Sequence, residues 1–582
     1  MSKPSSRQLD ARPWILAMGA VLASLALPAP AWPSDVLYVH GHIYTALPAA
    51  PWAQALAVTG SRIDAVGSDE QILKLRRGRT RLVDLHGRTV IPGFFDSHVH
   101  LRFGAMALHG FNLSTPAESI TPDKGELLVA RIREYAAAHP ADRILFGRAD
   151  FSASPPYSPR HELLDQAVSD RPVVIHGTYE HSLWLNARAL ALAGITDQPV
   201  ADPDEERNII RDASGHPSGV LIESAMELME RAVQKTLAAG EQTAMLLDGF
   251  RELNRYGITS VVNASGDLAE IRRYAALRDR GELTIRIRSA FASVAVPHKL
   301  TPQFLSDLEQ ARSEYHDEWL AANLVKFFAD GSTGQIPPLV YESGQFRAIV
   351  TELDRLGFQL MTHALRDDSV HMVLDAYAEA ARANGPRDRR MRIEHADITY
   401  AADFPRFAAQ SVIISMQPIF CCSETGTNYD PKERNPSDRW NTVEMSGAML
   451  ALGSDWPCAW PVDPFANIQE AVTREIWQSD DTAGVMNQPF DGAAQAGARP
   501  TGKVYTRQER ISVRQAVDAY TRNAAYAAFR DTEVGTLQPG KLADLAVLSQ
   551  DIFSVPGDEI GKTRVLLTVV GGRTVYEAAT PP

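Results

Sequence analysis

Side chains that can bind a metal ion recur along this chain in one setting, directly at the end of an apolar run. Residues 92–100 read Pro-Gly-Phe-Phe-Asp-Ser-His-Val-His and place His98 and His100 at such an end. In a β-strand, side chains at i and i+2 point to the same face, so two neutral imidazoles there can hold one metal ion. An isolated His-x-His is more often a pair of surface histidines, so the interpretation depends on further ligands downstream.

Further polar residues follow later apolar runs in the same way. They are Lys326, His363, His395, Gln417 and Asp455. Taken singly, a strand-end histidine is more often a hydrogen-bonded core residue, and such an aspartate is often the cap of the next helix. Taken together, the order of two histidines, a lysine, two histidines and an aspartate on successive strand ends indicates a metal-binding site.

The elements that must position these residues alternate between apolar strands and helical stretches. Besides the strand that ends at His100, strands are expected at residues 258–262, 285–290, 324–329, 358–362, 391–394, 412–416 and 449–453. Eight parallel strands with helical connections predict an α/β fold, a (β/α)8 TIM-like barrel with its site at the C-terminal strand ends. This barrel domain is expected over residues 92–534. Its first connection is too long for one helix, so residues 110–242 are expected to be a largely helical insertion.

Both ends of the chain have a different character, with short strands separated by glycine-bearing turns. Residues 35–91 and 535–582 share this pattern, and Gly571-Gly572 is typical of a hairpin turn. We therefore expect one small β-sandwich domain that is assembled from both termini.

The first residues are typical of an export signal. Lys3, Arg7 and Arg12 precede an apolar run over residues 14–27, and Ala29-Pro30-Ala31 offers a small-x-small cleavage site. The run is short for a membrane span, and prolines interrupt it. We expect residues 1–31 to be a signal peptide and the mature protein to be periplasmic or secreted, without a stable membrane span. An uncleaved membrane anchor is the alternative.

Composition limits the class of protein. The chain has 582 residues, 45% of them hydrophobic, which is enough for a large core, and its net charge of -13 is spread along the chain. Such a charge disfavours nucleic acid as a partner. Three cysteines exclude a four-cysteine zinc site. It stays open whether Cys458 pairs with Cys421 or Cys422 or whether all three are small buried apolar residues.

The ligand order and several local segments resemble the amidohydrolase superfamily, in particular the amidohydrolase 3 group that includes N-substituted formamide deformylases. Besides residues 92–100, the matching segments are 181–186 (His-Ser-Leu-Trp-Leu-Asn), 219–223 (Gly-Val-Leu-Ile-Glu), 325–332, 392–395, 453–457 and 535–545. The resemblance covers nearly everything after the signal segment. One departure follows His363, where the chain reads Ala-Leu-Arg-Asp and the group usually has Ala-x-Gly-Asp. Arg366 thus replaces a glycine beside the site.

The resemblance implies a cofactor of one or two divalent metal ions, with zinc preferred. It assigns His98, His100 and Asp455 to a buried ion, His363 and His395 to a second ion, and an N6-carboxylated Lys326 to the bridge between them. Burial lowers the pKa of a lysine, so that the neutral amine can react with carbon dioxide. An ion pair between Lys326 and Asp330 is the alternative.

The implied reaction is hydrolysis of a non-peptide C–N bond in an amide, an N-substituted formamide or a cyclic amide, through metal-activated water. Asp455 would move the proton of that water, and His181 would be a second catalytic contact. Candidate substrate-binding residues are Phe103, Phe151, Trp184, Arg366 and Trp456.

Two other functions stay open: a lactonase or esterase-type hydrolase on the same scaffold, and a non-catalytic exported protein that binds a metal or a ligand. The expected partner is a small-molecule amide substrate. A homodimer is suggested only by the family resemblance.

Overall fold

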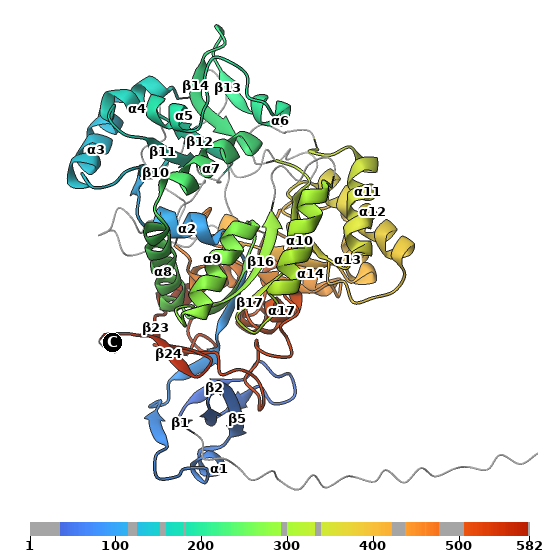
Figure 1. The fold of residues 1–582 in the computed structure, drawn as a ribbon. Coiled ribbons are helices and arrows are strands. Elements are labelled where there is room, and N and C mark those ends of the chain that lie inside the picture. Colours follow the sequence, from blue (N-terminus) through green and yellow to red (C-terminus); the bar gives the residue numbers. More distant parts are fainter. Residues whose placement is uncertain are drawn as a thin grey trace, which may run out of the picture.

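The computed structural model describes residues 35–113, 125–149, 151, 159–177, 181–292, 300–331, 339–421, 437–459, 461–475 and 506–579. The expected signal peptide at residues 1–31 lies outside this part of the chain. Figure 1 shows an inserted sheet with helices at the top, a barrel in the middle and two small sheets at the bottom. Within the described residues, no helix combines the length and the apolar character that crossing a membrane requires.

The central unit is the predicted (β/α)8 barrel. Its strands, in the order in which they neighbour one another, are β8 (Phe94–Val99), β15 (Ile258–Asn263), β16 (Arg286–Ala292), β17 (Leu320–Phe328), β18 (Gln359–Ala364), β19 (Arg392–His395), β20 (Ile413–Met416) and β21 (Leu450–Leu452). Each neighbouring pair is parallel. A parallel bridge between Val99 and Trp456 joins the first strand to the segment after the last, so the sheet closes.

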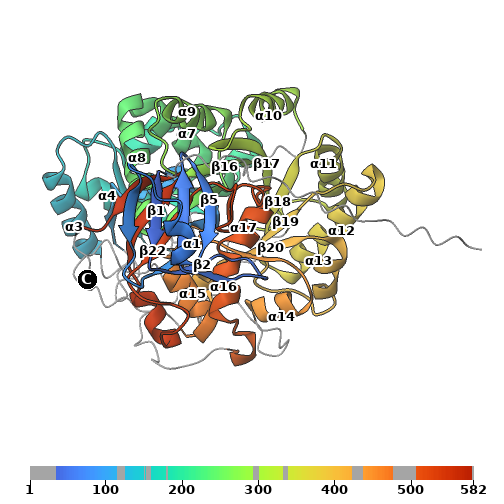
Figure 2. The ribbon, with the colours of Figure 1, turned by 90° about the horizontal axis from the view of Figure 1, so that it is seen from below.

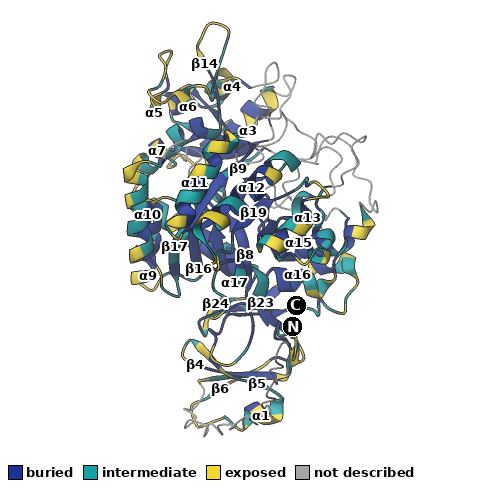
Figure 3. Ribbon diagram, turned by 90° about the vertical axis from the view of Figure 1, so that its right-hand side faces the viewer, coloured by how far each residue is buried: buried dark blue, intermediate teal, exposed yellow. Residues whose placement is uncertain are grey.

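These strands form because the chain supplies apolar runs that can be buried on both faces. Every residue of β8, β15, β18 and β19 is buried. Helices α9 (Leu268–Asp279), α10 (Pro302–Glu314), α11 (Ser343–Arg355) and α12 (Asp367–Asn384) lie outside the barrel (Figure 1). Figure 3 shows the strands in the buried colour and the exposed residues on outer faces, as expected for a parallel sheet covered by helices.

The insertion after the first strand differs from the expectation. It contains the helices α3 (Gly125–Ala138), α4 (His161–Ala167), α5 (Ala187–Leu192), α6 (Pro203–Glu206) and α7 (Met226–Thr236). These helices accompany a six-stranded sheet in the order β13 (Ile209–Arg211), β14 (Pro217–Ile222), β12 (Ser182–Leu185), β11 (Val173–Gly177), β10 (Leu145–Ala149) and β9 (Phe111–Asn112). The expectation of a largely helical insertion missed this sheet, because periodicity cannot distinguish short apolar runs from buried helical segments.

The small sheets combine both ends of the chain. One sheet has the order β5 (Arg62–Gly67), β4 (Ala55–Thr59), β1 (Val36–Val39) and β6 (Arg81–Asp84), and the other has β24 (Arg573–Glu577), β23 (Val565–Val570), β22 (Leu545–Leu548), β7 (Thr89–Pro92), β2 (His42–Tyr44) and β3 (Trp52–Ala53). β22 pairs with β7, which joins the two chain ends. One apolar cluster takes side chains from both sheets, and Figure 2 shows these strands in front of the barrel. The sandwich arrangement itself stays a prediction.

Candidate metal centre

The structure gathers the predicted histidines into a row at the C-terminal ends of the barrel strands. Ring centroids are 5.4 Å apart for His100 and His98, 5.1 Å for His98 and His395, and 4.6 Å for His395 and His363. His181, from the inserted sheet, extends the row, with its ring centroid 5.5 Å from that of His363. Residues far apart in the sequence therefore meet at one place.

Asp455 and Lys326 lie against one end of this row. Asp455 Oδ1 is 3.1 Å from His100 Nε2 and 3.4 Å from His98 Nε2. Lys326 Nζ is 3.2 Å from His98 Nε2. All six residues that the sequence predicts as metal ligands are therefore in one cluster, together with His181.

Asp455 lies in the turn after β21. Backbone hydrogen bonds join this turn to the end of β8 and so fix Asp455 beside His98 and His100. The Asp455 amide donates to the carbonyl of His98 at 2.8 Å, and the His100 amide donates to the carbonyl of Trp456 at 2.7 Å. Asp455 has φ +56° and His395 has φ +70°. Both are in the left-handed region, which is unusual for residues other than glycine and clusters at functional sites.

Three histidines are held through Nδ1, which leaves Nε2 facing the cluster. His98 Nδ1 is 2.7 Å from Glu394 Oε2, and His395 Nδ1 is 2.7 Å from Gln417 Oε1. His100 Nδ1 is 3.0 Å from Ser265 Oγ. Such partners fix the tautomer and the ring orientation of metal-binding histidines.

Glu394 is a positioning residue that sequence reasoning missed. Its carboxylate is fully buried and accepts hydrogen bonds from Arg392 Nε at 2.9 Å and Arg392 Nη2 at 2.8 Å. Arg392 also donates to the carbonyl of Ser97 at 2.7 Å, on the strand that carries His98. The available signal was an Arg and a Glu at i and i+2 of an apolar strand, which must share one face inside the barrel.

The surroundings favour neutral imidazoles, the form that binds a metal ion. Burial, and then the nearby Lys326, hold the pKa of His98 well below its usual range, and burial lowers the pKa of His395 to about 4. Burial also lowers the pKa of Lys326 to about 8. Burial alone would raise the pKa of Asp455, but its hydrogen bond with His100 and the neighbouring cationic groups hold it below its usual value. The Asp455 carboxylate thus lies beside the imidazoles of His98 and His395, whose neutral form burial favours.

The cluster fits a metal ion by the positions of its ligand atoms. One ligand atom each from His98, His395 and Asp455 lie within 4.8 Å of one another, and the same holds for His100, Asp455 and Cys458. His363 Nε2 is a buried polar atom without a hydrogen-bond partner. Because buried polar atoms are nearly always satisfied, a ligand role would explain this nitrogen.

His181 is held by Glu223, which directly follows strand β14 of the inserted sheet. Glu223 was given no role by sequence reasoning. His181 Nδ1 is 2.9 Å from Glu223 Oε2. Burial disfavours the charged imidazole, but the neighbouring Glu223 outweighs it and raises the pKa of His181. Glu223 has φ +45°. The sequence did contain a sign of this pair. Segments 181–186 and 219–223 both match the family, and each supplies one of the two residues.

The predicted substrate contacts are only partly brought to the cluster. Phe103 is near it, with its ring centroid 6.3 Å from that of His100. Arg366 donates from Nη2 to Asp368 at 2.9 Å, and its side chain is partly exposed. Phe151 lies over Trp184, with ring centroids 6.1 Å apart.

Trp184 and Trp456 are both fully buried. Trp184 belongs to the apolar core of the inserted sheet, and its Nε1 donates to the carbonyl of Arg160 at 3.1 Å. Trp456 packs on Gly104, where an added Cβ would lie 2.2 Å from the indole. The structure places both residues in apolar clusters, and their role as substrate contacts stays a prediction. An aromatic after a strand end is also an ordinary way to fill a core.

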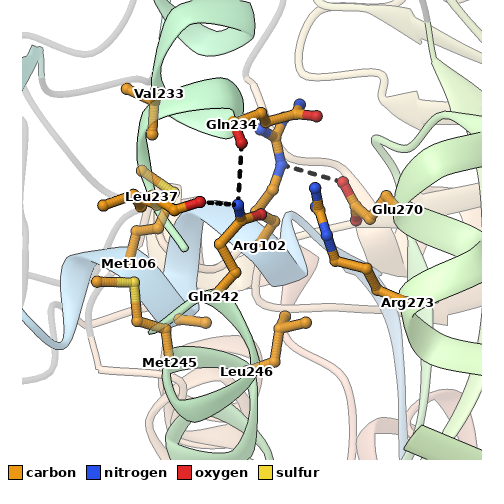
Figure 4. A pocket seen from close by; sticks show the side chains of 11 residues that line it. Arg102, Met106, Val233, Gln234, Leu237, Gln242, Met245, Leu246, Glu270 and Arg273 are labelled. Atoms are coloured by element: carbon orange, nitrogen blue, oxygen red, sulfur yellow. Dashed lines mark hydrogen bonds and ion pairs between the residues drawn. The ribbon is translucent and has the colours of Figure 1, made fainter. Parts of the chain in front are cut away.

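A cavity lies away from the cluster, between α2 (Leu101–Ala107), α7, α8 (Ala239–Arg255) and α9 (Figure 4). Arg102 crosses it and pairs with Glu270 at 3.0 Å, measured from Nε to Oε2, and with Glu230 at 3.1 Å, measured from Nη2 to Oε2. Glu230 belongs to α7 and Glu270 to α9, so this ion cluster joins the insertion to the barrel. None of the predicted metal ligands lines this cavity.

Comparison with known proteins agrees with this architecture. The model of the family described as "Amidohydrolase family" matches residues 81–576. Protein LONG AFTER FAR-RED 3 of Arabidopsis thaliana is 29% identical over 572 residues, covering 93% of this chain and 92% of the relative. N-substituted formamide deformylase of Arthrobacter pascens is 25% identical over 565 residues, covering 93% and 98% of the two chains.

Among solved structures, an uncharacterized metal-dependent hydrolase from Pyrococcus horikoshii OT3 has the same fold. Its TM-score is 0.68 at 22% identity, and the match covers 90% of this chain and 99% of that one. The family model spans most of the chain, including both halves of the histidine cluster. This chain is therefore a hydrolase that belongs to the amidohydrolase family.

Proposed function

We propose that this protein hydrolyses a non-peptide C–N bond, in an amide, an N-substituted formamide or a cyclic amide, at a metal centre. One observation carries the proposal: Asp455 Oδ1 lies within 3.4 Å of the Nε2 atoms of both His98 and His100. A carboxylate is thus available beside the ligand atoms of the histidines. The similarity to a protein named N-substituted formamide deformylase supports the choice of an amide bond.

The ligands would be His98, His100, Lys326, His363, His395 and Asp455, with zinc as the preferred ion. When bound, such an ion lowers the pKa of water towards neutrality and polarises a carbonyl group. Asp455 would take the proton of the attacking water on its carboxylate and return it to the leaving nitrogen. The histidines cannot do this, because their free nitrogens would be engaged as ligands.

Lys326 has the environment that N-carboxylation requires. The amine is buried, which favours its neutral form. Its nitrogen would form a bond to the carbon of carbon dioxide and release one proton, which leaves a carbamate that can bridge two ions. Asp330, the alternative partner of Lys326, instead accepts hydrogen bonds from the amides of Leu365 and Arg366.

His181 would contact the substrate from the side of the inserted sheet. Its Nδ1 is engaged by Glu223, so its Nε2 is the atom left to donate to a substrate carbonyl oxygen. Phe103 is placed to be an apolar wall beside His100.

We further propose that residues 1–31 direct export. Protein recovered from fractionated cells should begin just after Ala31 and appear in the periplasmic or secreted fraction. A full-length N-terminus in the membrane fraction would contradict this and favour an anchor.

The first test is elemental analysis of purified protein beside Lys326→Ala, with the exposed Lys235→Ala as the matched control. About two zinc-like ions per chain, lost in part only in Lys326→Ala, would support a lysine-bridged centre. One ion that is unaffected would make Lys326 structural. Protein without tightly held metal would favour the non-catalytic binding function.

A substrate panel follows on the same preparation. It should contain N-substituted formamides, other secondary amides, cyclic amides, lactones and carboxylic esters. Turnover of at least one amide class supports the proposal, whereas turnover of lactones or esters alone would overturn it in favour of the alternative hydrolase.

A further inference from the structure

Asn263, the last residue of β15, connects two backbone segments that adjoin His100. Its Oδ1 accepts a hydrogen bond from the amide of Leu101 at 3.0 Å, and Leu101 directly follows His100. Its Nδ2 donates to the carbonyl of Ser265, and Ser265 Oγ lies 3.0 Å from His100 Nδ1. The Asn263 side chain is fully buried, so water does not compete for these hydrogen bonds.

The amide group of Asn263 is itself held by the ion cluster that joins the insertion to the barrel. Its Nδ2 donates to Glu270 Oε1 on α9 at 3.0 Å and to Ser289 Oγ on β16 at 3.2 Å. The other carboxylate oxygen of Glu270 pairs with Arg102, as Figure 4 shows, and Arg102 also pairs with Glu230 on α7. Asn263 therefore lies between this ion cluster and the surroundings of one predicted metal ligand.

The orientation of His100 depends on the nearby backbone more than that of His98 does. His98 Nδ1 is held by the carboxylate of Glu394, which two hydrogen bonds from Arg392 fix in place. His100 Nδ1 instead has the Ser265 hydroxyl as its partner, and a hydroxyl can turn to donate or to accept. The direction of His100 Nε2 is therefore set by where the backbone places Ser265 and the main chain of His100.

We propose that Asn263 is a positioning residue for the metal centre: it fixes Ser265 and the start of α2, and so keeps His100 Nε2 directed at the ion. This inference rests on the proposed metal centre. An amide suits the position, because an N–H group faces Oδ1 whereas a carbonyl and a carboxylate face Nδ2. An aspartate of the same shape would turn an anionic oxygen towards Glu270 and towards the carbonyl of Ser265.

Asn263→Asp removes the donor contacts of this side chain with little change in its volume. We expect its zinc affinity in chelator competition to fall by about 10–100-fold, which is typical when a partner that orients a metal-binding histidine is lost. Asn254→Asp is the matched control, because Asn254 is buried just before the opposite end of β15 and donates to the carbonyls of Ile258 and Thr284. It should lower the free energy of unfolding of the metal-free protein in urea but leave zinc affinity unchanged.

A double-mutant cycle with Ser265→Ala tests whether the effect reaches His100 through the serine. Because both changes act on one contact of His100, the double variant should lose less zinc affinity than the product of the two single fold-changes.

The outcomes separate this inference from the proposed function. Unaffected zinc affinity in Asn263→Asp, an equal loss in Asn254→Asp, or fold-changes that simply multiply would each overturn the inference and leave the hydrolase proposal standing. Unaltered protein that binds no zinc overturns both. If Asn263→Asp does not fold, Asn263→Ala takes its place, since it removes the same contacts without adding a charge.

Discussion

His181 Nδ1 lies 2.9 Å from Glu223 Oε2, and these two residues continue neighbouring antiparallel strands of the inserted sheet. The pairing of Ser182 with Ile222 and of Leu183 with Leu221 sets this register. The insertion therefore contributes a side chain to the candidate site. It places the imidazole of His181, oriented by Glu223, beside His363 in the row of histidines.

Glu223→Gln tests that orientation. We expect kcat to fall by roughly 10–100-fold, because partners that orient a histidine at a metal site contribute about that much, while KM and metal content stay nearly unchanged. Glu227→Gln on α7, where Glu227 pairs with Arg231, is the matched control and should behave as the unaltered enzyme. An equal loss of kcat in both variants, or none in Glu223→Gln, would contradict the role of the pair. Partial rescue by Glu223→Asp would support it.

Asp455→Asn should separate proton transfer from metal binding. An amide keeps one oxygen donor but cannot accept the proton, so we expect most of the metal to remain while turnover drops by about 10²–10⁴-fold. Elemental analysis and steady-state kinetics give the two values. Asp197→Asn, which changes an exposed aspartate of the insertion, is the control. Unchanged turnover in Asp455→Asn would remove Asp455 from the proposed mechanism.

Glu394→Gln should weaken metal binding without touching a ligand. His98 would lose the carboxylate that holds its Nδ1, so metal affinity should fall by about 10–100-fold in chelator competition. Because Arg392 would be left buried beside an amide, the melting temperature should fall as well. Glu352→Gln removes an exposed pair with Arg355 and should change neither quantity. Full affinity in Glu394→Gln would show that His98 is oriented by other contacts.

Arg102→Met should loosen the junction between the insertion and the barrel. It leaves the buried carboxylate of Glu270 without its cation, and breaking such a pair costs about 3–5 kcal/mol in the free energy of unfolding. Urea unfolding monitored by tryptophan fluorescence measures the loss. Arg251→Met, at an exposed position on α8, should stay within about 0.5 kcal/mol of the unaltered protein. Equal free energies of unfolding for the two variants would show that the Arg102 ion cluster does not contribute measurably to stability.

The acid dependence of stability should depend partly on Asp354. Burial tends to raise the pKa of this carboxyl, but hydrogen bonds from Arg389, Asn384 and Arg387 outweigh burial and hold the pKa below its usual value. A lowered folded-state pKa means that the ionised carboxylate stabilises the fold above about pH 4. That contribution is lost as the pH falls through the folded-state pKa.

The variant Asp354→Asn should therefore be less stable at neutral pH by about 1–3 kcal/mol, because it removes the carboxylate that the partly buried Arg387 and Arg389 share. The difference between the two proteins should narrow below pH 4. Urea titrations at several pH values measure it, with the exposed Asp388→Asn as control. A difference that does not vary with pH would show that the Asp354 carboxylate is not the group that titrates.

The barrel and its ligand cluster could be predicted because buried parallel strands leave a strong trace in the sequence. Residues 91–95 are an apolar run, and the polar residues Asp96, Ser97 and His98 follow it towards the strand end. This pattern predicted that His98, Lys326, His363 and Asp455 would lie close together, and they do. The partners that orient them lack such a trace. Glu394 on β19 and Ser265 after β15 become meaningful only once the barrel brings them to His98 and His100, and nothing local in the sequence records that placement.

The sequence also could not show whether an aromatic residue near a strand end lines a pocket or fills the core. Trp184 and Trp456 follow or lie in strands, as pocket walls do, but the sequence does not show on which side a helix will pack. Trp456 faces Gly104 of α2, and only a glycine there admits the indole. In the insertion, strands of two to six residues were too short for their period to identify them.

The turn after β21 is hydrogen-bonded to the end of β8. The proposed metal centre therefore lies where the last strand of the barrel meets the first. A nascent chain that has not yet supplied Asp455 lacks one of the six proposed ligands, however well its first strands are formed. Metal affinity and ring closure are then linked equilibria, since an ion that binds only the closed form stabilises it by mass action. Metal supply during folding would thus help to decide how much of the protein reaches the closed state, before any substrate is present.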